Sequence, residues 1–323
     1  MMNRRELLRN AAVFGCSIPF LGYCSRTSAI ETFSLDSDIH KFTIGEFQCT
    51  IFRDTMWKYL AKDYFINADE VDLENALSRY NITPDNIPSP FISMLLQRGN
   101  EKILIDSGIG FSEEPLVFRG NEYVFKGQVN HLLAKEGINH SDITDVIISH
   151  FHPDHIGGIF SGKGNLNFPN AKFHTHQKEW DFWHSPSSEN QSPLFKIFVE
   201  QNTTPLKDQN LNLINGDFQE IIPGITAVVA DGHTPGQIAL IIGSDKNQLI
   251  YISDAFLHPL HIERLHWQTN YDFDHQKAKQ TRIKLLELAN ENEMMINAFH
   301  FEFPGLGNVE KVKENWKWNY LQS

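Results

Sequence analysis

Five short runs of apolar, largely β-branched residues recur along the chain, each bounded by polar or turn-forming residues. They cover residues 102–105, 145–149, 225–230, 237–242 and 248–252. Runs of this length and composition are typical of strands buried on both faces. We therefore expect these segments to lie inside sheets.

Segments with a helical pattern lie between these runs, at residues 127–136, 177–183 and 274–290. Strands that alternate with helices indicate an α/β layered domain. Turn signals at residues 98–100 and 244–247 predict hairpins, so at least part of the sheet structure is antiparallel or mixed. The chain shows no internal repeat and no low-complexity linker, which favours one compact domain.

Polar residues follow four of the apolar runs directly. Asp106 follows the first run and His150 the second, while His233 and Asp254 follow later ones. In layered α/β folds, ligands gather at the ends of strands. The pattern therefore predicts that these side chains cluster into a site.

The composition excludes several classes of function. The 323 residues include 28 basic and 40 acidic side chains, for a formal charge of −12, and no Lys/Arg run appears beyond the N-terminus. This charge excludes nucleic acid as an expected partner. Cysteine occurs only at Cys16, Cys24 and Cys49, too few for a cysteine-rich zinc module. Cys49 lies in a strand-like segment and is expected to be a small buried apolar residue.

The N-terminus has the pattern of an export signal. Arg4 and Arg5 precede an apolar stretch over residues 11–23 and small residues at 27–29. The arginine pair resembles a twin-arginine signal, so we expect residues 1–29 to be removed and residues 30–323 to form a periplasmic or secreted protein. An ordinary signal peptide, or lipid attachment at Cys24, is the alternative. No later stretch has the apolar length of a membrane span.

A dense group of metal-ligand residue types follows the second strand. It consists of His150, His152, Asp154 and His155. Imidazole nitrogens and carboxylate oxygens are the ligands that Zn²⁺ and similar divalent ions prefer. A solvated His-rich loop is the alternative reading. His233, Asp254 and His300 are further candidates for the same site, and seven ligands are enough for two metal ions.

These residues resemble the His-x-His-x-Asp-His motif and the later His, Asp and His of the metallo-β-lactamase superfamily. The resemblance runs from about residue 42 to residue 309 and implies an αββα sandwich, with two mixed sheets flanked by helices. It further implies one metal ion on His150, His152 and His233, and a second on Asp154, His155 and His300. It assigns Asp254 as the bridge between the ions. Asp106 matches a position expected to orient a ligand histidine.

Local strings narrow the resemblance within the superfamily. Residues 168–171, 177–183, 229–237 and 300–307 resemble methyl parathion hydrolase and related dizinc lactonases. The N-acyl-homoserine lactonases typically carry a tyrosine three residues after the bridging aspartate, where this chain has Leu257. His258 or His261 could replace that donor, but a surface or core histidine is the simpler interpretation.

The resemblance implies a metal-dependent hydrolase that opens lactones, N-acyl-homoserine lactones above all, as in quorum quenching. We expect a hydroxide that bridges two divalent ions to attack, and Asp154 to shuttle the proton to the departing alkoxide. Zinc is the expected metal, with Mn, Co or Fe as alternatives. The alternatives in function are a phosphotriesterase or aryl esterase of methyl parathion hydrolase type and, more remotely, an inactive metal-binding protein. A homodimer is common among such relatives.

Two aromatic groups are candidates for the walls of a substrate pocket. The first lies between residues 56 and 66, in a stretch over residues 54–92 that could arch over the metals as an apolar lid. The second, Trp180, Phe182 and Trp183, lies on an expected helix. Aromatic side chains at helical spacing often belong to the core instead, so both interpretations stay open for each group.

Overall fold

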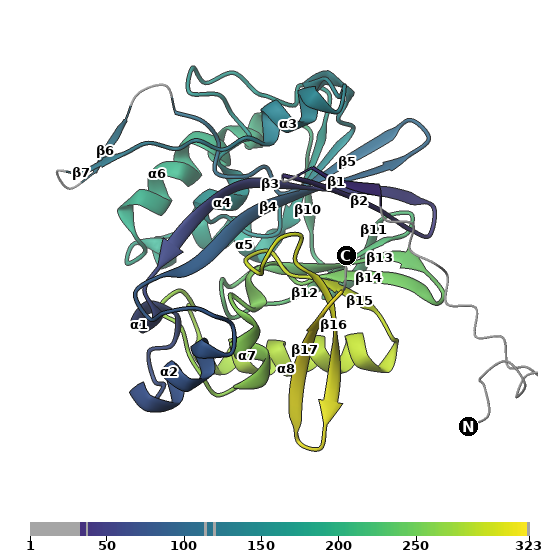
Figure 1. The fold of residues 1–323 in the computed structure, drawn as a ribbon. Helices are drawn as coiled ribbons and strands as arrows, with labels where there is room; N and C mark the ends of the chain where they lie inside the picture. The colour runs from purple at the N-terminus through teal and green to yellow at the C-terminus, as the bar shows by residue number, and fades with distance from the viewer. Residues whose placement is uncertain (1–32, 37, 113–114, 119–120, 322–323) are drawn as a thin grey trace, which may run out of the picture.

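The computed structural model describes residues 33–36, 38–112, 115–118 and 121–321. The expected export signal at residues 1–29, with Cys16 and Cys24, lies outside the described residues. Two large sheets pack face to face between layers of helices (Figure 1). This arrangement confirms the expected αββα sandwich, built from two mixed sheets.

The first sheet has eight strands in the order β1-β2-β3-β4-β5-β8-β9-β10. It is antiparallel from β1 to β5 and parallel from β5 to β10. Its strands are β1 (Phe33–Asp36), β2 (Ile39–Ile44), β3 (Phe47–Tyr59), β4 (Ile87–Arg98), β5 (Glu101–Ile105), β8 (Asp145–Ile147), β9 (Lys172–His176) and β10 (Leu211–Ile214). A separate hairpin pairs β6 (Leu116–Phe118) with β7 (Asn121–Tyr123).

The second sheet has seven strands that follow one another in chain order. All neighbours are antiparallel except β14 and β15, which are parallel and joined through the long helix α8 (His275–Glu291). The strands are β11 (Phe218–Ile222), β12 (Ile225–Val229), β13 (Ile238–Ser244), β14 (Asn247–Tyr251), β15 (Met295–Asn297), β16 (Leu306–Val312) and β17 (Asn315–Tyr320).

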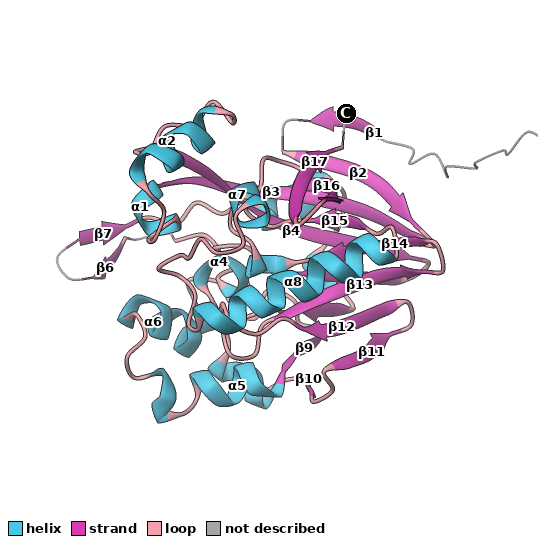
Figure 2. Cartoon of the chain, turned by 90° about the horizontal axis from the view of Figure 1, so that it is seen from below, coloured by secondary structure: helices cyan, strands magenta, loops and turns pink. Residues whose placement is uncertain are grey.

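Alternating side chains of the second sheet enter two different cores. On β13, Leu240 and Ile242 pack into the large core between the sheets, whereas Ile241 packs into the outer core. This is the two-residue period of a strand that is covered on both faces. The outer core is closed by Leu285 and Leu286 of α8, which lies across that face of the sheet (Figure 2). Burial on both faces explains why these strands read as continuous apolar runs.

The other helices are short and lie at the edges and outer faces of the sheets. They are α1 (Ala61–Tyr64), α2 (Glu70–Ser78), α3 (Val129–Lys135), α4 (Pro153–Ile156), α5 (Gln177–Trp183), α6 (Pro193–Asn202) and α7 (Pro259–Glu263), with 3₁₀ turns at His140–Asp142, Pro186–Ser188, Thr204–Asp208 and Ser253–Ala255. Among the described residues, no helix combines the length and the apolar character needed to cross a membrane.

The five predicted strands correspond to β5, β8, β12, β13 and β14, and the three predicted helices to α3, α5 and α8. Both predicted hairpins are present, between β4 and β5 and between β13 and β14. Cys49 is buried and unpaired, as expected. These elements place each candidate metal ligand, and Asp106, on the segment that follows a strand of one of the two sheets.

Candidate metal centre

The seven candidate ligands lie on loops that leave both sheets at one edge of the sandwich. His150 and His152 follow β8, and Asp154 and His155 lie in the short helix α4 that comes next. The second sheet supplies the other three, which follow β12, β14 and β15: His233, Asp254 and His300. Six of the seven side chains are buried, and Asp154 is partly exposed. The clustering predicted from the strand ends is therefore present.

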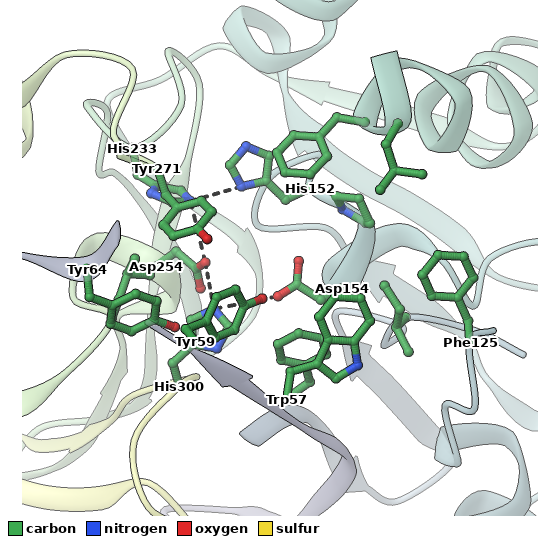
Figure 3. Close-up of a pocket in the computed structure, with 16 residues that line it drawn as sticks. Trp57, Tyr59, Tyr64, Phe125, His152, Asp154, His233, Asp254, Tyr271 and His300 are labelled. Atoms are coloured by element: carbon green, nitrogen blue, oxygen red, sulfur yellow. Dashed lines mark hydrogen bonds and ion pairs between the residues drawn. The ribbon is translucent and has the colours of Figure 1, made fainter. Parts of the chain in front are cut away.

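Asp254 lies at the centre of the cluster. Its Oδ2 atom is 3.0 Å from Nε2 of His300 and 3.4 Å from Nε2 of His233 (Figure 3). Its Oδ1 atom is 3.3 Å from Nε2 of His155. One carboxylate thus faces histidines that come from both sheets, which is the placement that a bridging ligand requires.

The donor atoms form two groups of four, and Asp254 belongs to both. Within each group the atoms lie within 4.8 Å of one another. The groups are His150, His152, His233 and Asp254, and Asp154, His155, Asp254 and His300. They match the two ligand sets that the resemblance implied for a dimetal site.

The cluster contains buried polar atoms that make no hydrogen bond to any described residue. They are Nε2 of His150, Nε2 of His155 and Oδ1 of Asp254. Buried polar atoms are nearly always satisfied, so an orphaned set that converges on one point fits bound cations. Burial, helped by the neighbouring His155 and His152, lowers the pKa of His150 well below its usual range. A neutral imidazole is the form that ligates a metal.

Asp106 contacts the ring of the candidate ligand His155. Its Oδ2 atom lies 2.8 Å from Nδ1 of His155, and the same carboxylate accepts hydrogen bonds from the backbone and hydroxyl of Ser149 and from the hydroxyl of Tyr251. A carboxylate on Nδ1 leaves Nε2 of His155 directed at the cluster. This contact is the one that the role predicted for Asp106 requires.

His300 and His233 have comparable supports. Nδ1 of His300 lies 2.8 Å from Oγ of Ser89, and Ser89 in turn lies 2.9 Å from the hydroxyl of Tyr64. Nδ1 of His233 lies 3.3 Å from Oδ1 of Asp272. The other oxygen of Asp272 accepts a 2.8 Å hydrogen bond from the buried guanidinium of Arg282, on α8.

Glu179 of α5 joins the two loops that carry three of the ligands. Its carboxylate is fully buried and accepts four hydrogen bonds. On one side the donors are the backbone of Phe151, at 2.9 Å, and the indole of Trp183, at 2.7 Å. On the other side they are the hydroxyl of Thr234, at 2.7 Å, and the backbone of Gly236, at 3.0 Å. Phe151 lies between two ligand histidines, and Thr234 follows a third.

The cluster opens into an aromatic pocket that is itself open to solvent. Five of the candidate ligands line it: His152, Asp154, His233, Asp254 and His300. The walls are Trp57, Tyr59, Tyr64, Phe91, Ile109, Phe125, Pro153, Leu194, Phe195, Leu257 and Tyr271. Apart from the ligands and the three tyrosines, every wall side chain is apolar or an indole.

The structure shows which of the two aromatic groups lines the pocket, a question that the sequence left open. Trp57, Tyr59 and Tyr64 of the first group line the pocket, whereas Met56 and Leu60 are exposed. In the second group, Phe182 and Trp183 belong to the core, and Trp180 packs against it. The second group is therefore not a pocket wall.

The two histidines near Leu257 also lie outside the pocket. Nδ1 of His258 accepts a hydrogen bond from the backbone of Leu260 and caps α7. Nε2 of His261 lies 2.9 Å from the carbonyl oxygen of Tyr64. Both are core histidines, and Leu257 itself lines the pocket.

Several residues of the site were not singled out from the sequence. They are Ser89, Ser149, Glu179, Tyr251, Tyr271, Asp272 and Arg282. Ser149 stands directly before His150, so its place next to the motif was a usable signal. Ser89 and Asp272 carry no local signal, because their partners His300 and His233 lie 211 and 39 residues away.

The model of the Metallo-beta-lactamase superfamily matches residues 93–292. This chain belongs to that superfamily. Among curated proteins, it is similar to an N-acyl homoserine lactonase of Bacillus cereus, with 25% identity over 208 residues that cover 59% of this chain and 74% of the relative. An N-acyl homoserine lactonase of Bacillus sp is also 25% identical, over 58% of this chain and 72% of the relative.

Solved structures of the superfamily share the fold. AidC, a dizinc quorum-quenching lactonase in complex with a product, superposes with a TM-score of 0.75 at 23% identity, covering 88% of this chain and 98% of AidC. The hydrolase AbOPH has a TM-score of 0.77 at 22% identity, over 90% of this chain and 99% of AbOPH. These likenesses support the αββα architecture.

Proposed function

We propose that this superfamily hydrolase opens lactones, with N-acyl-homoserine lactones as the substrate class. The observation that carries the proposal is the pair of donor groups that share Asp254 at the floor of an aromatic pocket. The curated relatives named as N-acyl homoserine lactonases support this choice of substrate.

We further propose that His150, His152, His233 and Asp254 hold one divalent ion, and that Asp154, His155, Asp254 and His300 hold the other. Imidazole and carboxylate donors suit Zn²⁺, and they also accept Mn, Co or Fe. When bound, such ions supply a water activated at neutral pH and polarise the carbonyl of the substrate.

The residues of the chain then orient the ligands and move the proton. Asp106, Ser89 and Asp272 each contact Nδ1 of a ligand histidine and fix its orientation. Asp154 lines the pocket and can pass the proton released by water to the ring oxygen. In the overall reaction, water adds to the carbonyl carbon, the ring C–O bond breaks, and the ring oxygen takes up a proton and leaves as an alcohol.

The pocket walls favour a neutral substrate with an apolar part. Trp57, Phe91 and Phe125 offer apolar surface to an acyl chain, and pockets of this kind use few polar groups to orient the ligand. No lysine or arginine lines the pocket to bind the charges of a highly anionic substrate.

A second candidate function is the cleavage of phosphotriesters or aryl esters. Leu257 favours it, because this pocket-lining side chain is apolar where N-acyl-homoserine lactonases typically carry a tyrosine. The two candidates share the same donor groups and differ only in the preferred substrate.

One assay separates these functions. Zinc-loaded protein is offered N-hexanoyl-L-homoserine lactone, 4-nitrophenyl acetate and diethyl 4-nitrophenyl phosphate, before and after chelation. We expect the highest kcat/KM on the lactone, and loss of activity with chelator or in His300→Ala. The control His131→Ala changes an exposed histidine of α3 and should retain activity. Higher kcat/KM on the phosphotriester would establish the second function, and inactivity on all three would indicate a metal-binding protein.

We also propose that residues 1–29 direct the protein to the periplasm or the exterior through the twin-arginine route, and that the mature protein forms a homodimer. Replacement of Arg4 and Arg5 by Lys should retain the precursor in the cytoplasm, as cell fractionation would show. Light scattering of the mature protein would measure the mass of the assembly.

A further inference from the structure

Three tyrosines supply the hydroxyl groups of the pocket walls. Tyr59 is the last residue of β3, Tyr64 belongs to α1, and Tyr271 lies in the loop before α8. Their rings pack together, with centroids 5.1 Å apart for Tyr59 and Tyr64, 5.7 Å for Tyr59 and Tyr271, and 5.9 Å for Tyr64 and Tyr271. This cluster forms one wall of the pocket beside the donor groups (Figure 3).

The hydroxyl of Tyr64 is already engaged. It lies 2.9 Å from Oγ of Ser89, which lies 2.8 Å from Nδ1 of His300. The ring is buried, with 1% of its surface exposed. Tyr64 therefore supports a ligand histidine and is not free to contact a substrate.

The hydroxyls of Tyr59 and Tyr271 make no hydrogen bond to any other described residue, and both side chains are only partly buried. Figure 3 shows them turned towards the side of the pocket that holds Asp154 and Asp254. Neither hydroxyl is a fully buried atom, so each is open to the pocket, where it can donate a hydrogen bond to a bound ligand. The pocket thus contains two hydroxyl groups, free to donate a hydrogen bond, beside the two groups of candidate metal ligands.

Apart from the candidate ligands and the tyrosines, the indole N–H of Trp57 is the other side-chain donor among the residues that line the pocket, and Figure 3 shows its nitrogen on the side of the ring away from Asp154. Leu257 is apolar, and the neighbouring His258 and His261 each use a ring nitrogen within the core. Of the two free phenols, Tyr59 is the more firmly held, because its backbone pairs with Ile87 in the sheet. Positioned donors act best when they belong to rigid elements.

We propose that the Tyr59 hydroxyl donates a hydrogen bond to the substrate carbonyl oxygen that gains negative charge during hydrolysis, and that Tyr271 holds the Tyr59 ring in place. The inference rests on the proposed hydrolytic function and names the residue that takes the place of the tyrosine missing at position 257. A donor aimed at developing charge acts mainly on the transition state, so its loss lowers kcat more than it raises KM.

The test compares Tyr59→Phe, Tyr271→Phe and the wild type, all zinc-loaded. The control Tyr80→Phe removes a hydroxyl that bonds Glu263 outside the pocket. We expect Tyr59→Phe to lower kcat on N-hexanoyl-L-homoserine lactone by about 100-fold, as for loss of one oxyanion donor. Tyr271→Phe keeps the ring that packs on Tyr59, so it should leave kcat nearly unchanged, as should Tyr80→Phe. Metal content should match the wild type in all variants, and the thermal midpoint should match it in Tyr59→Phe and Tyr271→Phe.

An unchanged kcat in Tyr59→Phe, or a larger fall in Tyr271→Phe than in Tyr59→Phe, would overturn the assignment. The same comparison is run with 4-nitrophenyl acetate, whose carbonyl needs the same donor. A wild type that hydrolyses this ester but not the lactone refutes the proposed substrate class, and the Tyr59→Phe comparison on the ester then still decides the role of Tyr59.

Discussion

Glu179→Gln is the most informative single substitution outside the ligands. The carboxylate of Glu179 accepts two hydrogen bonds on each oxygen, from Phe151 and Trp183 on Oε1 and from Thr234 and Gly236 on Oε2. The glutamine amide keeps one oxygen and presents an NH₂ group to the other pair. Two buried donors therefore lose their acceptor, whichever way the amide turns.

The magnitude follows from these two donors. A buried donor without an acceptor costs about 1–3 kcal/mol, so we expect Glu179→Gln to lower the free energy of unfolding by about 2–6 kcal/mol. This is a large part of the about 5–15 kcal/mol that stabilises a typical domain. The loops of His150, His152 and His233 also lose their common anchor, so the affinity of their donor group for metal should fall.

Urea unfolding of the metal-free protein measures the first effect, and competition with a zinc chelator measures the second. The matched control is Glu189→Gln, an exposed residue beyond the end of α5, which should change stability by no more than about 0.5 kcal/mol. A Glu179→Gln protein as stable as this control would refute the reasoning, because it would show that the four contacts contribute no net stability.

Three further predictions concern single side chains. Asp106→Asn should weaken zinc binding by about 10–100-fold in chelator competition, because the carboxylate on Nδ1 of His155 is lost; unchanged affinity would contradict this support. Phe125 lines both the pocket and an adjacent groove. Phe125→Ala should therefore raise the ratio of kcat/KM for the decanoyl lactone to that for the hexanoyl lactone, by up to about 0.8 kcal/mol for each added CH₂ group that becomes buried. An unaltered ratio would show that the acyl chain of the substrate lies elsewhere. Burial raises the pKa of the Cys49 thiol to about 12, so the thiol stays protonated at pH 8. It should therefore resist alkylation until the protein unfolds, which peptide mapping would show. Rapid labelling of the native protein would contradict the burial of Cys49.

The sequence predicted the part of the fold that is buried on both faces. Strands β5, β8, β12, β13 and β14 stand out because both faces of each are covered, so their apolar runs are nearly unbroken. The candidate ligands were found because each follows a strand closely. The local sequence pattern was enough to predict a strand wherever both faces of the segment are buried along its whole length.

The long pair of strands β3 and β4 was harder to predict. Residues 54–59 were open to interpretation as part of a lid, yet they continue β3 and pair with residues 87–91. Pro88 and Pro90 lie in that partner segment and ordinarily argue against a strand. They are tolerated because β5 pairs only with residues 94–98 of β4, so residues 88 and 90 have a strand neighbour on one side alone.

Apart from Asp106, the residues that support the candidate ligands could not be predicted, for a different reason. Glu179 and Thr234 are 55 residues apart, and Ser89 and His300 are 211 apart. Such pairs form only when the two sheets pack, and no local periodicity encodes them.

Each donor group takes two residues from the loops of the first sheet and two from those of the second, with Asp254 counted in both. Neither half of the sandwich alone can therefore complete a tetrad of ligands. Under the proposed ligand assignment, capture of the second ion during synthesis would wait until residue 300 has emerged and the halves have docked. Each bound ion would then tie the halves together, so its binding energy would oppose their separation directly.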